Sequence, residues 1–490
     1  MLRVFEKIAS LRGNDTYAVL SRQDIRKIDE NAHRVLSEIG FKAGHPRAIK
    51  ELKRKGYNVD GDVIKVRPSA IDKLLKKIPR HRDTRKAAKG SVHVGYMANQ
   101  VYDAEMDRVR YPTRADLHKA TIVALSIPEV TIIGPLFEPK DVPGAEDVLM
   151  LDVMMRRIKN PGCEILNRKS IPVVMDMCRW LVGSHDEILR RRMVIYYAFI
   201  TSPLRYDFNV LDTAFAALDA GIPARFGTPM TMAGASAPVT LAGTLVMSLA
   251  ETYTGLVMSD AFGQSWDASM TPMVMDQATG ASLYAGPDRV LLNMASADLY
   301  RYLDLGGGVG QLTGVDACKP GIEAAIEKTY TAMLNLMVGH PPVIALGGLL
   351  GPAGLVGSIE QILIDAEVIS MLNRLVEGIE VSDDTMAFDV IKELQFSTDY
   401  LSHEHTVRHF RNELWFPKLM KRLNPSAWNM EKPDMLEEAK KKVKEILASS
   451  DPRALSEKQE RELDTILEKA DIPPCRKAGT GSSMERNTQK

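Results

Sequence analysis

The segment MVIYYAFITSPLRYDFNVLDTAFAALDAGIPARFGT, residues 193–228, decides the fold class of this chain. It opens on a continuous apolar run (193–200), passes through a stretch with helical apolar spacing (208–219) and closes on a second short run (223–228). Near-continuous apolar strands that alternate with helices are typical of parallel strands covered on both faces. The segment therefore predicts a β-α-β unit and an α/β fold.

The same alternation extends from residue 126 to residue 380. Eight such units favour a closed (β/α)₈ TIM barrel over an open sheet, with the chemistry at the carboxyl ends of the strands. The predicted strands are VTIIGPLF (130–137), CEIL (163–166), MVIYYAFI (193–200), PARFGT (223–228), QSWDAS (264–269), RVLLNMAS (289–296), GVGQLTG (308–314) and PVIALGG (342–348).

Before the barrel, residues 1–125 are expected to form an N-terminal α+β accessory region. Its first helix (20–40) has a single apolar stripe at helical period. Ser21 with Asp24 resembles a capping box, and Gly40 stands where a helix ends.

Helices are expected again after the barrel, over residues 381–475, and the polar stretch 476–490 is expected to be a disordered tail. Inside the barrel, a long segment rich in small residues (237–261) predicts a helix with Ser236 as its N-cap. Small side chains let such a helix pack tightly against the strands.

The composition argues against two classes of partner. Lys+Arg and Asp+Glu both number 63, so a basic face for nucleic acid or an anionic membrane has no support. No apolar run reaches the ~18 residues that a membrane span needs. The four cysteines form no C-x-x-C pair, which favours reduced thiols in the cytoplasm. Because large barrels usually associate, we expect a homo-oligomer.

Aromatic residues are scarce, at 6%, so their positions near predicted strand ends are informative. Trp266 and Asp267 offer a ring face and a carboxylate, both complementary to a cation. Tyr253 lies in the long helix just before them. Each ring taken singly could equally be a core residue.

Two glycine-rich stretches, LGGGVG (305–310) and LGGLLGPAGLVG (346–357), lie in loops at the last two predicted strands. No Lys-Ser/Thr follows either cluster, which excludes a P-loop. A phosphate cradle remains one interpretation. The other is close backbone approach, to a neighbouring strand or to a flat ligand.

The segment HEHTVRH (403–409) is the histidine cluster of the chain. His405 and His409 are four residues apart and share a helix face, so a metal with Glu404 or Glu413 is conceivable. His403 points elsewhere and no cysteine joins them. We therefore favour a structural or pocket-lining helix with no metal, and His405 is a candidate substrate contact.

Four stretches together resemble the trimethylamine methyltransferase family. They are PMTMAGASAPVTLAGTLVMSLAE (229–251), VDACKPGIEAAIEKTY (315–330), IALGGLLGPAGLVGSIEQILIDAEVI (344–369) and YLSHEHTVRHFRNELWFP (400–417). The opening helix resembles that of the family as well, and the motifs occur in family order over roughly residues 18 to 428. The chain contains only standard residues, so it resembles the branch without pyrrolysine. It departs from the common pattern at IAL (344–346) and DQA (276–278).

This resemblance implies a (β/α)₈ barrel and methyl transfer from a quaternary or tertiary methylated amine, such as glycine betaine. The acceptor is the Co(I) of a corrinoid carried by a separate cognate protein, with no cofactor tightly bound. It also implies anaerobic one-carbon metabolism such as methanogenesis. A quaternary amine leaves as a neutral amine, which needs no general acid. Catalysis is then mainly positioning, and no catalytic residue is identified.

The resemblance also suggests roles for single residues. Trp266, Asp267 and Tyr253 are expected to hold the cation, while backbone N–H groups near Gly347 and Gly348, or Arg168, meet a substrate carboxylate. The expected corrinoid-facing residues are Gly307, Gly308 and Gly351.

Two alternatives belong to other classes. One is a metal-dependent TIM-barrel hydrolase or lyase that uses His403, His405 and His409. The other is a non-catalytic subunit that binds an amine without transferring its methyl group.

Overall fold

The computed structural model describes residues 18–78, 89–267, 269–305, 314–338 and 341–474, and side chains in all of these except that of Asp267. Two hydrogen-bonded arcs consist entirely of parallel strands, in the orders β16-β4-β7 and β13-β11-β9-β8, and no ladder among the described residues joins one arc to the other. The strands are β4 (Ser91–Val94), β7 (Val130–Ile133), β8 (Cys163–Glu164), β9 (Val194–Phe199), β11 (Ala224–Gly227), β13 (Trp266–Asp267) and β16 (Val343–Gly347).

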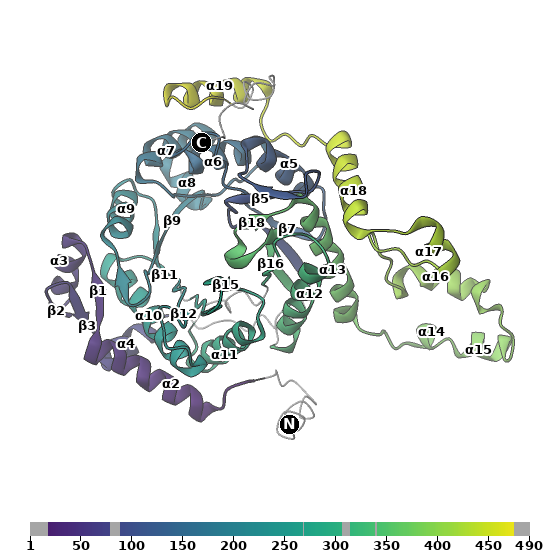
Figure 1. Ribbon diagram of the computed structural model, residues 1–490, viewed down its shortest axis with the longest axis horizontal. Helices are drawn as coiled ribbons and strands as arrows, with labels where there is room; N and C mark the ends of the chain where they lie inside the picture. Colours follow the sequence, from purple (N-terminus) through teal and green to yellow (C-terminus); the bar gives the residue numbers. More distant parts are fainter. Residues whose placement is uncertain (1–17, 79–88, 268, 306–313, 339–340, 475–490) are drawn as a thin grey trace.

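Helices surround these strands on the outside (Figure 1). They are α5 (Arg114–Leu125), α6 (Glu146–Arg157), α7 (Ile171–Val182), α8 (His185–Arg190), α9 (Phe208–Asp219), α10 (Leu241–Phe262), α11 (Pro287–Leu303), α12 (Ile322–Met337) and α13 (Ile359–Glu377). The predicted β9-α9-β11 unit is confirmed, with β9 and β11 paired in parallel.

Two predictions about the strands need correction, and a third falls almost entirely outside the described residues. The parallel strands of the two arcs begin at β4, which pairs with β16 and β7, and so lie partly before the expected boundary at residue 125. The run 289–296 is part of α11, because its apolar residues continue a helical stripe from Pro287 to Leu303. The predicted strand 308–314 lies outside the described residues except for Gly314.

Short strands and turns connect these units. They are β5 (Gln100–Asp103), β6 (Arg108–Arg110), β12 (Met232–Ala233), β14 (Met273–Met275), β15 (Ser282–Leu283), β17 (Leu349–Leu350), β18 (Val356–Gly357), η2 (Arg168–Ser170) and η3 (Pro352–Gly354).

Helix α10 is buried along most of its length, as its small residues predict. A Cβ on Gly255 would lie 2.7 Å from the Cα of Gly227 in β11, so only glycine permits this approach of helix and strand. The N-cap is Thr240 rather than the expected Ser236, whose hydroxyl instead accepts from the Met232 N–H. By length and hydropathy α10 could cross a membrane, but 72% of its apolar window is buried inside the protein.

The N-terminal region packs against the outer side of α10. The Ser21–Asp24 capping box is present, and the helix ends in a π-turn before Gly40, which adopts φ 87°. The elements are α2 (Arg22–Arg34), η1 (Val35–Ile39), β1 (Phe41–Ala43), α3 (Pro46–Arg54), β2 (Asn58–Asp60), β3 (Val63–Lys65) and α4 (Pro68–Leu75). Strand β1 pairs in parallel with β10 (Arg205–Tyr206), which follows β9.

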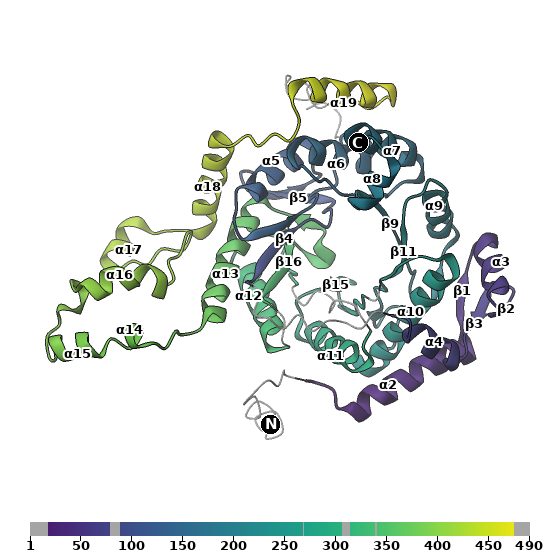
Figure 2. The same cartoon turned by 180° about the vertical axis from the view of Figure 1, so that it is seen from behind.

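The strands of the two arcs and the helices around them are here called the ring. After α13 the chain leaves the ring and later returns to it (Figure 2). Residues 379–413, here called the arm, lie beyond α13, whereas α18 packs on α13 and α5, and α19 packs on α7. The elements are α14 (Asp383–Met386), α15 (Phe388–Leu394), η4 (Asp399–Leu401), α16 (Glu404–Glu413), α17 (Pro425–Glu431), α18 (Met435–Ser449) and α19 (Glu457–Lys469).

A buried ion pair supports the end of β16. The Lys328 Nζ lies 2.6 Å from Asp365 Oδ2 and 3.0 Å from the Leu346 carbonyl oxygen, with both charged side chains almost fully buried. Burial raises the pKa of Asp365 and lowers that of Lys328. The same carboxylate accepts the Gly348 N–H at 2.8 Å, so the turn after β16 is tied to α13.

Candidate active site on the inner side of the strands

Strand β9 divides its side chains between two environments. Tyr196 faces the helices, because its hydroxyl donates to the Val210 carbonyl of α9. Successive residues of a strand point to opposite faces, so Tyr197 and Phe199 lie on the other, inner side. Their rings stack there with centroids 5.8 Å apart.

The neighbouring strands add one charged residue each to this inner side. Arg225 in β11 is the register partner of Tyr197, and its guanidinium lies 5.7 Å from the centre of that ring. Its Nη1 is 3.5 Å from the Tyr197 hydroxyl. Glu164 in β8 pairs with Ile195, two residues before Tyr197, and so lies on the same side.

Glu164 is the acid of this group. Burial raises the pKa of its carboxyl group to about 7. Among the described residues no hydrogen bond or ion pair reaches this carboxylate, so nothing offsets the cost of its desolvation. A carboxylate in this state favours the approach of a cation.

The other arc contributes His93 in β4 and Ile132 in β7, which are register partners. The His93 Nε2 lies 3.1 Å from the Ser91 hydroxyl, and burial lowers the pKa of the imidazole, which favours its neutral form. Ile132 is 55% exposed and Phe199 is 37% exposed. Solvent therefore reaches the inner side of both arcs.

One buried carboxylate holds two of the loops at the carboxyl ends of the strands. Glu251 of α10 accepts the Ser202 hydroxyl and the Leu204 N–H, each at 2.8 Å, and also the Thr231 hydroxyl. It thereby ties the loop after β9 to the loop after β11. Burial raises the pKa of Glu251, although the three hydrogen bonds act to lower it.

A polar cavity of about 430 Å³ opens near the loops that follow β7, β8 and β9. Arg168 lines it, but its guanidinium pairs with Asp212, so the expected carboxylate ligand already has a partner. The lining residues are Glu138, Glu146, Leu166, Asn167, Arg168, Asn209, Asp212 and Thr213.

The expected aromatic site does not assemble as predicted. Trp266 is the register partner of helix-facing Phe226, and its Nε1 donates to the Thr252 carbonyl of α10. Tyr253 is fully buried against α2, where its hydroxyl donates to Asp29 Oδ1 at 2.6 Å. Both rings are therefore packing residues; Asp267 belongs to β13, but its side chain lies outside the described structure.

The described glycines that were expected to contact the substrate or the corrinoid make contacts within the protein instead. The Gly348 N–H is donated to Asp365, so it has no hydrogen left for a ligand. A Cβ on Gly347 would lie 2.4 Å from Val92 Cγ1, so glycine there serves strand packing. Gly351 has φ 73° and donates its N–H to the Ala317 carbonyl. Gly307 and Gly308 lie outside the described residues.

His405 lies in α16 of the arm, remote from the strand ends (Figure 1). His403 is the N-cap of this helix, and its side chain accepts the His405 N–H. The cluster therefore does not line the inner side of the strands. The metal-dependent hydrolase gains no support at the strand ends from these histidines.

Sequence reasoning missed Glu164, Tyr197 and Arg225. The available signal was an ionisable residue inside an otherwise apolar short strand, as in CEIL and ARFG. Charged side chains are rarely buried among apolar residues, so a charged residue in such a strand is expected to point away from the covering helices.

Parallel strands wrapped by helices, with ionisable and aromatic side chains on an accessible inner side, are an arrangement typical of α/β enzymes that act on small molecules. The family model described as trimethylamine methyltransferase (MTTB) matches residues 5–472, and the chain belongs to this family. It is therefore a methyltransferase by family.

The chain is similar to the glycine betaine methyltransferase of Desulfitobacterium hafniense (strain Y51), with 26% identity over 92% of this chain and 96% of that protein. It is 26% identical to the proline betaine:corrinoid methyltransferase of Eubacterium limosum, over 88% and 93% of the two chains. The crystal structure of the hydroxylamine MtmB complex covers 91% of this chain and 92% of its own, with TM-score 0.50 and 12% identity. That likeness concerns the fold alone.

Proposed function

We propose that this enzyme transfers a methyl group from a methylated amine that carries a carboxylate, such as a betaine, to the corrinoid of a separate partner protein. The observation that carries the proposal is the inner side of the strands, where an unpaired acid, aromatic rings and an arginine face the same space. Relatives named for glycine betaine and proline betaine support the substrate class.

The cationic end of such a substrate fits Glu164, Tyr197 and Phe199. A quaternary ammonium has no N–H to donate, so aromatic faces and a carboxylate are its natural partners. Binding of the cation stabilises the ionised form of Glu164, which burial alone disfavours. The carboxylate end fits Arg225, whose position beside the Tyr197 ring is already set.

The bound corrinoid supplies a strong nucleophile that accepts the methyl group. The protein orients the substrate so that one methyl group faces the open carboxyl end of the strands. As the C–N bond breaks, the nitrogen retains the bonding electron pair and leaves as a neutral amine. No proton is required for that departure, which suits a site with one unpaired acid.

Apolar side chains at several strand ends fit the docking of the corrinoid-bearing partner. A flat, broad ring system needs an open and partly apolar rim rather than a closed pocket. The exposed residues of this rim are Tyr96, Leu166, Phe199, Met230 and Val239. We further propose that the two arcs belong to one closed (β/α)₈ barrel, whose interior side chains they display.

The arm supports the proposal that this chain forms a homo-oligomer. Several of its large apolar side chains are exposed, which a stable soluble protein avoids unless another surface covers them. Those more than 70% exposed are Ile379, Val381, Phe396 and Leu401. The corrinoid protein binds and leaves in each cycle, whereas a second copy of this chain is always present, so we favour the copy as the occupant.

The test is methyl transfer to a reduced corrinoid protein, followed by its absorbance, across a panel of betaines and trimethylamine. We expect turnover with a betaine, and Arg225→Gln to raise KM for that betaine while leaving KM for trimethylamine unchanged. Binding without turnover would indicate a non-catalytic subunit instead.

A matched pair of variants tests the inner side. Tyr197→Phe and Tyr196→Phe each remove one hydroxyl group from neighbouring residues on opposite faces of β9. We expect only Tyr197→Phe to raise the KM for the betaine, because its hydroxyl lies beside Arg225. Equal effects on KM would contradict the assigned faces.

A further inference from the structure

The arm lacks a hydrophobic core of its own. None of the residues in α14, α15, η4 or α16 is buried. Short helices of four to ten residues are not stable in water without tertiary support. Some other interaction must therefore hold α14 beside α16.

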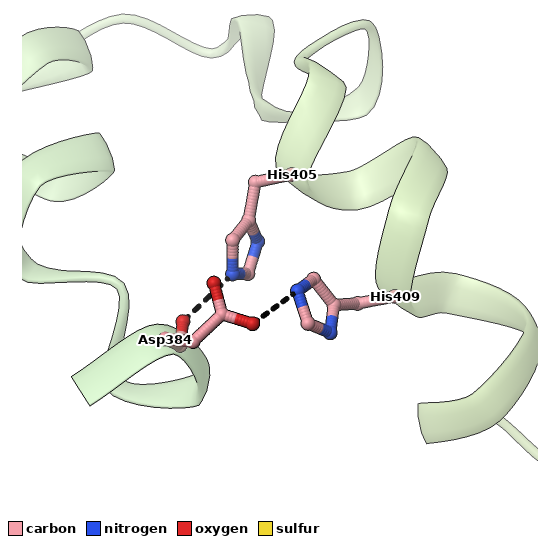
Figure 3. A group of neighbouring side chains, drawn as sticks. All are labelled: Asp384, His405 and His409. Atoms are coloured by element: carbon pink, nitrogen blue, oxygen red, sulfur yellow. Dashed lines mark hydrogen bonds and ion pairs between the residues drawn. The ribbon is translucent and has the colours of Figure 1, made fainter. Parts of the chain in front are cut away.

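Asp384, His405 and His409 make contacts between these two helices (Figure 3). The His409 Nε2 lies 3.1 Å from Asp384 Oδ2, and the His405 Nε2 lies 3.0 Å from the Asp384 backbone oxygen. The two imidazole rings are 4.3 Å apart between centroids. Both rings therefore point from α16 toward a single residue of α14.

The helical spacing explains this arrangement. Residues four apart lie on one face of a helix, so His405 and His409 project together from α16. His403, at the N-cap, lies on another side and instead approaches Glu393, with Nε2 3.7 Å from Oε2. The carboxylate beside these two rings is that of Asp384 in α14, rather than that of Glu404 or Glu413, which the sequence suggested.

We propose that Asp384, His405 and His409 bind a divalent transition-metal ion, with Zn²⁺ as the best match. One ligand atom from each residue can be chosen such that all three lie within 4.8 Å of one another. Two imidazoles and a carboxylate are a common donor set for zinc, with bonds of about 2.0–2.2 Å. Small rotations of the side chains close that distance, and water completes the coordination because Asp384 is exposed.

One cation competes for the same acid. The Arg408 Nη2 lies 3.9 Å from Asp384 Oδ1, at the edge of ion-pair distance, with both side chains more than half exposed. Such a pair is weak, about 0–1 kcal/mol. A metal ion that coordinates Asp384 Oδ2 leaves Oδ1 for Arg408, so the two interactions are compatible.

The site acts as a clip rather than as a catalytic centre. It lies in the arm, away from the strand ends where the inner-side residues gather (Figure 1). Small units without a core commonly gain their stability from a structural metal. The ion would fix α14 against α16 and so give the arm one defined shape.

The experiment uses the full-length enzyme, stripped with a chelator and titrated with ZnCl₂, with bound metal measured by elemental analysis. We expect one equivalent per chain, lost in Asp384→Ala, His405→Ala and His409→Ala. The matched control is His403→Asn, which removes a histidine from the same cluster but retains a good N-cap. This control should retain the full equivalent.

Two further measurements do not depend on the variants. Co²⁺ in place of Zn²⁺ should give the visible absorption of a low-symmetry site with nitrogen ligands, and Zn²⁺ should slow proteolysis between α14 and α16. A wild-type protein that binds less than one equivalent would overturn the proposal. So would equal metal loss in His403→Asn and His409→Ala.

Discussion

Helix α13 and the arm that follows it differ in how they are held. Buried side chains run along α13 from Ile359 to Leu372, and they include the ion-paired Asp365. In the arm no helix buries a residue, and Phe396 is 99% exposed. The ring is thus held by its own core, whereas the arm depends on ion pairs, the metal ion that we propose and contacts with other molecules.

The largest expected effect on stability comes from comparing a buried carboxylate of α13 with an exposed carboxylate of the arm. Asp365→Asn leaves the buried Lys328 ammonium without its counter-charge and should cost about 3–5 kcal/mol of stability. The matched change in the arm, Asp384→Asn, removes an exposed partner and should cost about 1 kcal/mol or less. Urea unfolding followed by circular dichroism measures both.

If Asp365→Asn does not fold, the double variant Lys328→Met with Asp365→Leu tests the same point. Replacing both charged partners by apolar residues removes the unpaired charge, so it should recover part of the stability, although the Gly348 N–H and the Leu346 carbonyl lose their partners. Similar losses for Asp365→Asn and Asp384→Asn would remove the distinction between ring and arm.

The pH dependence of stability tests the buried position of Glu164 on the inner side of the strands. Its pKa in the folded protein is raised from 4.5 to about 7 by burial. The stability that it contributes is therefore fully present below pH 4.5 and is lost as pH rises through about 7. Glu164→Gln should remove this part of the pH dependence, which thermal unfolding between pH 4 and 8 would measure.

The same residue links pH to substrate binding. Affinity for a quaternary ammonium should increase as pH rises through 7, because the ionised carboxylate attracts the cation. In Glu164→Gln the KM should be higher and should not change with pH over this range. An unchanged KM would show that the cation binds elsewhere.

A smaller effect is expected at the contact between the ring and the N-terminal region. Tyr253→Phe deletes a buried hydrogen bond and leaves Asp29 with one partner fewer, at a cost of about 1–2 kcal/mol. The KM for a betaine should not change, since this ring packs against α2. A raised KM with normal stability would restore Tyr253 to the substrate site.

The smallest effect on unfolding is expected in the arm. Phe396→Ser removes an exposed phenyl group and should change the free energy of unfolding by less than about 0.5 kcal/mol. It should nevertheless reduce self-association, as measured by light scattering at several protein concentrations. A large loss of stability without a change in mass would mean that Phe396 packs within its own chain.

Local patterns in the sequence determined much of this protein. The apolar run of β9, the period of α9 and the Ser21–Asp24 capping box each depend on neighbours within a few residues, and all three are present. The family signature rests on local motifs in order, and the match to residues 5–472 confirms it.

Only the tertiary structure decided which side chains meet. The same periodicity allows Tyr253 to face a ligand or another helix, and the packing of α2 on α10 selects the helix. The register of β9 against β11 brings Arg225 to Tyr197, and the fold of the arm brings Asp384 to His409. Periodicity indicates which residues share one side of a helix or strand. What packs against that side comes from distant segments of the chain, whose placement depends on the whole core.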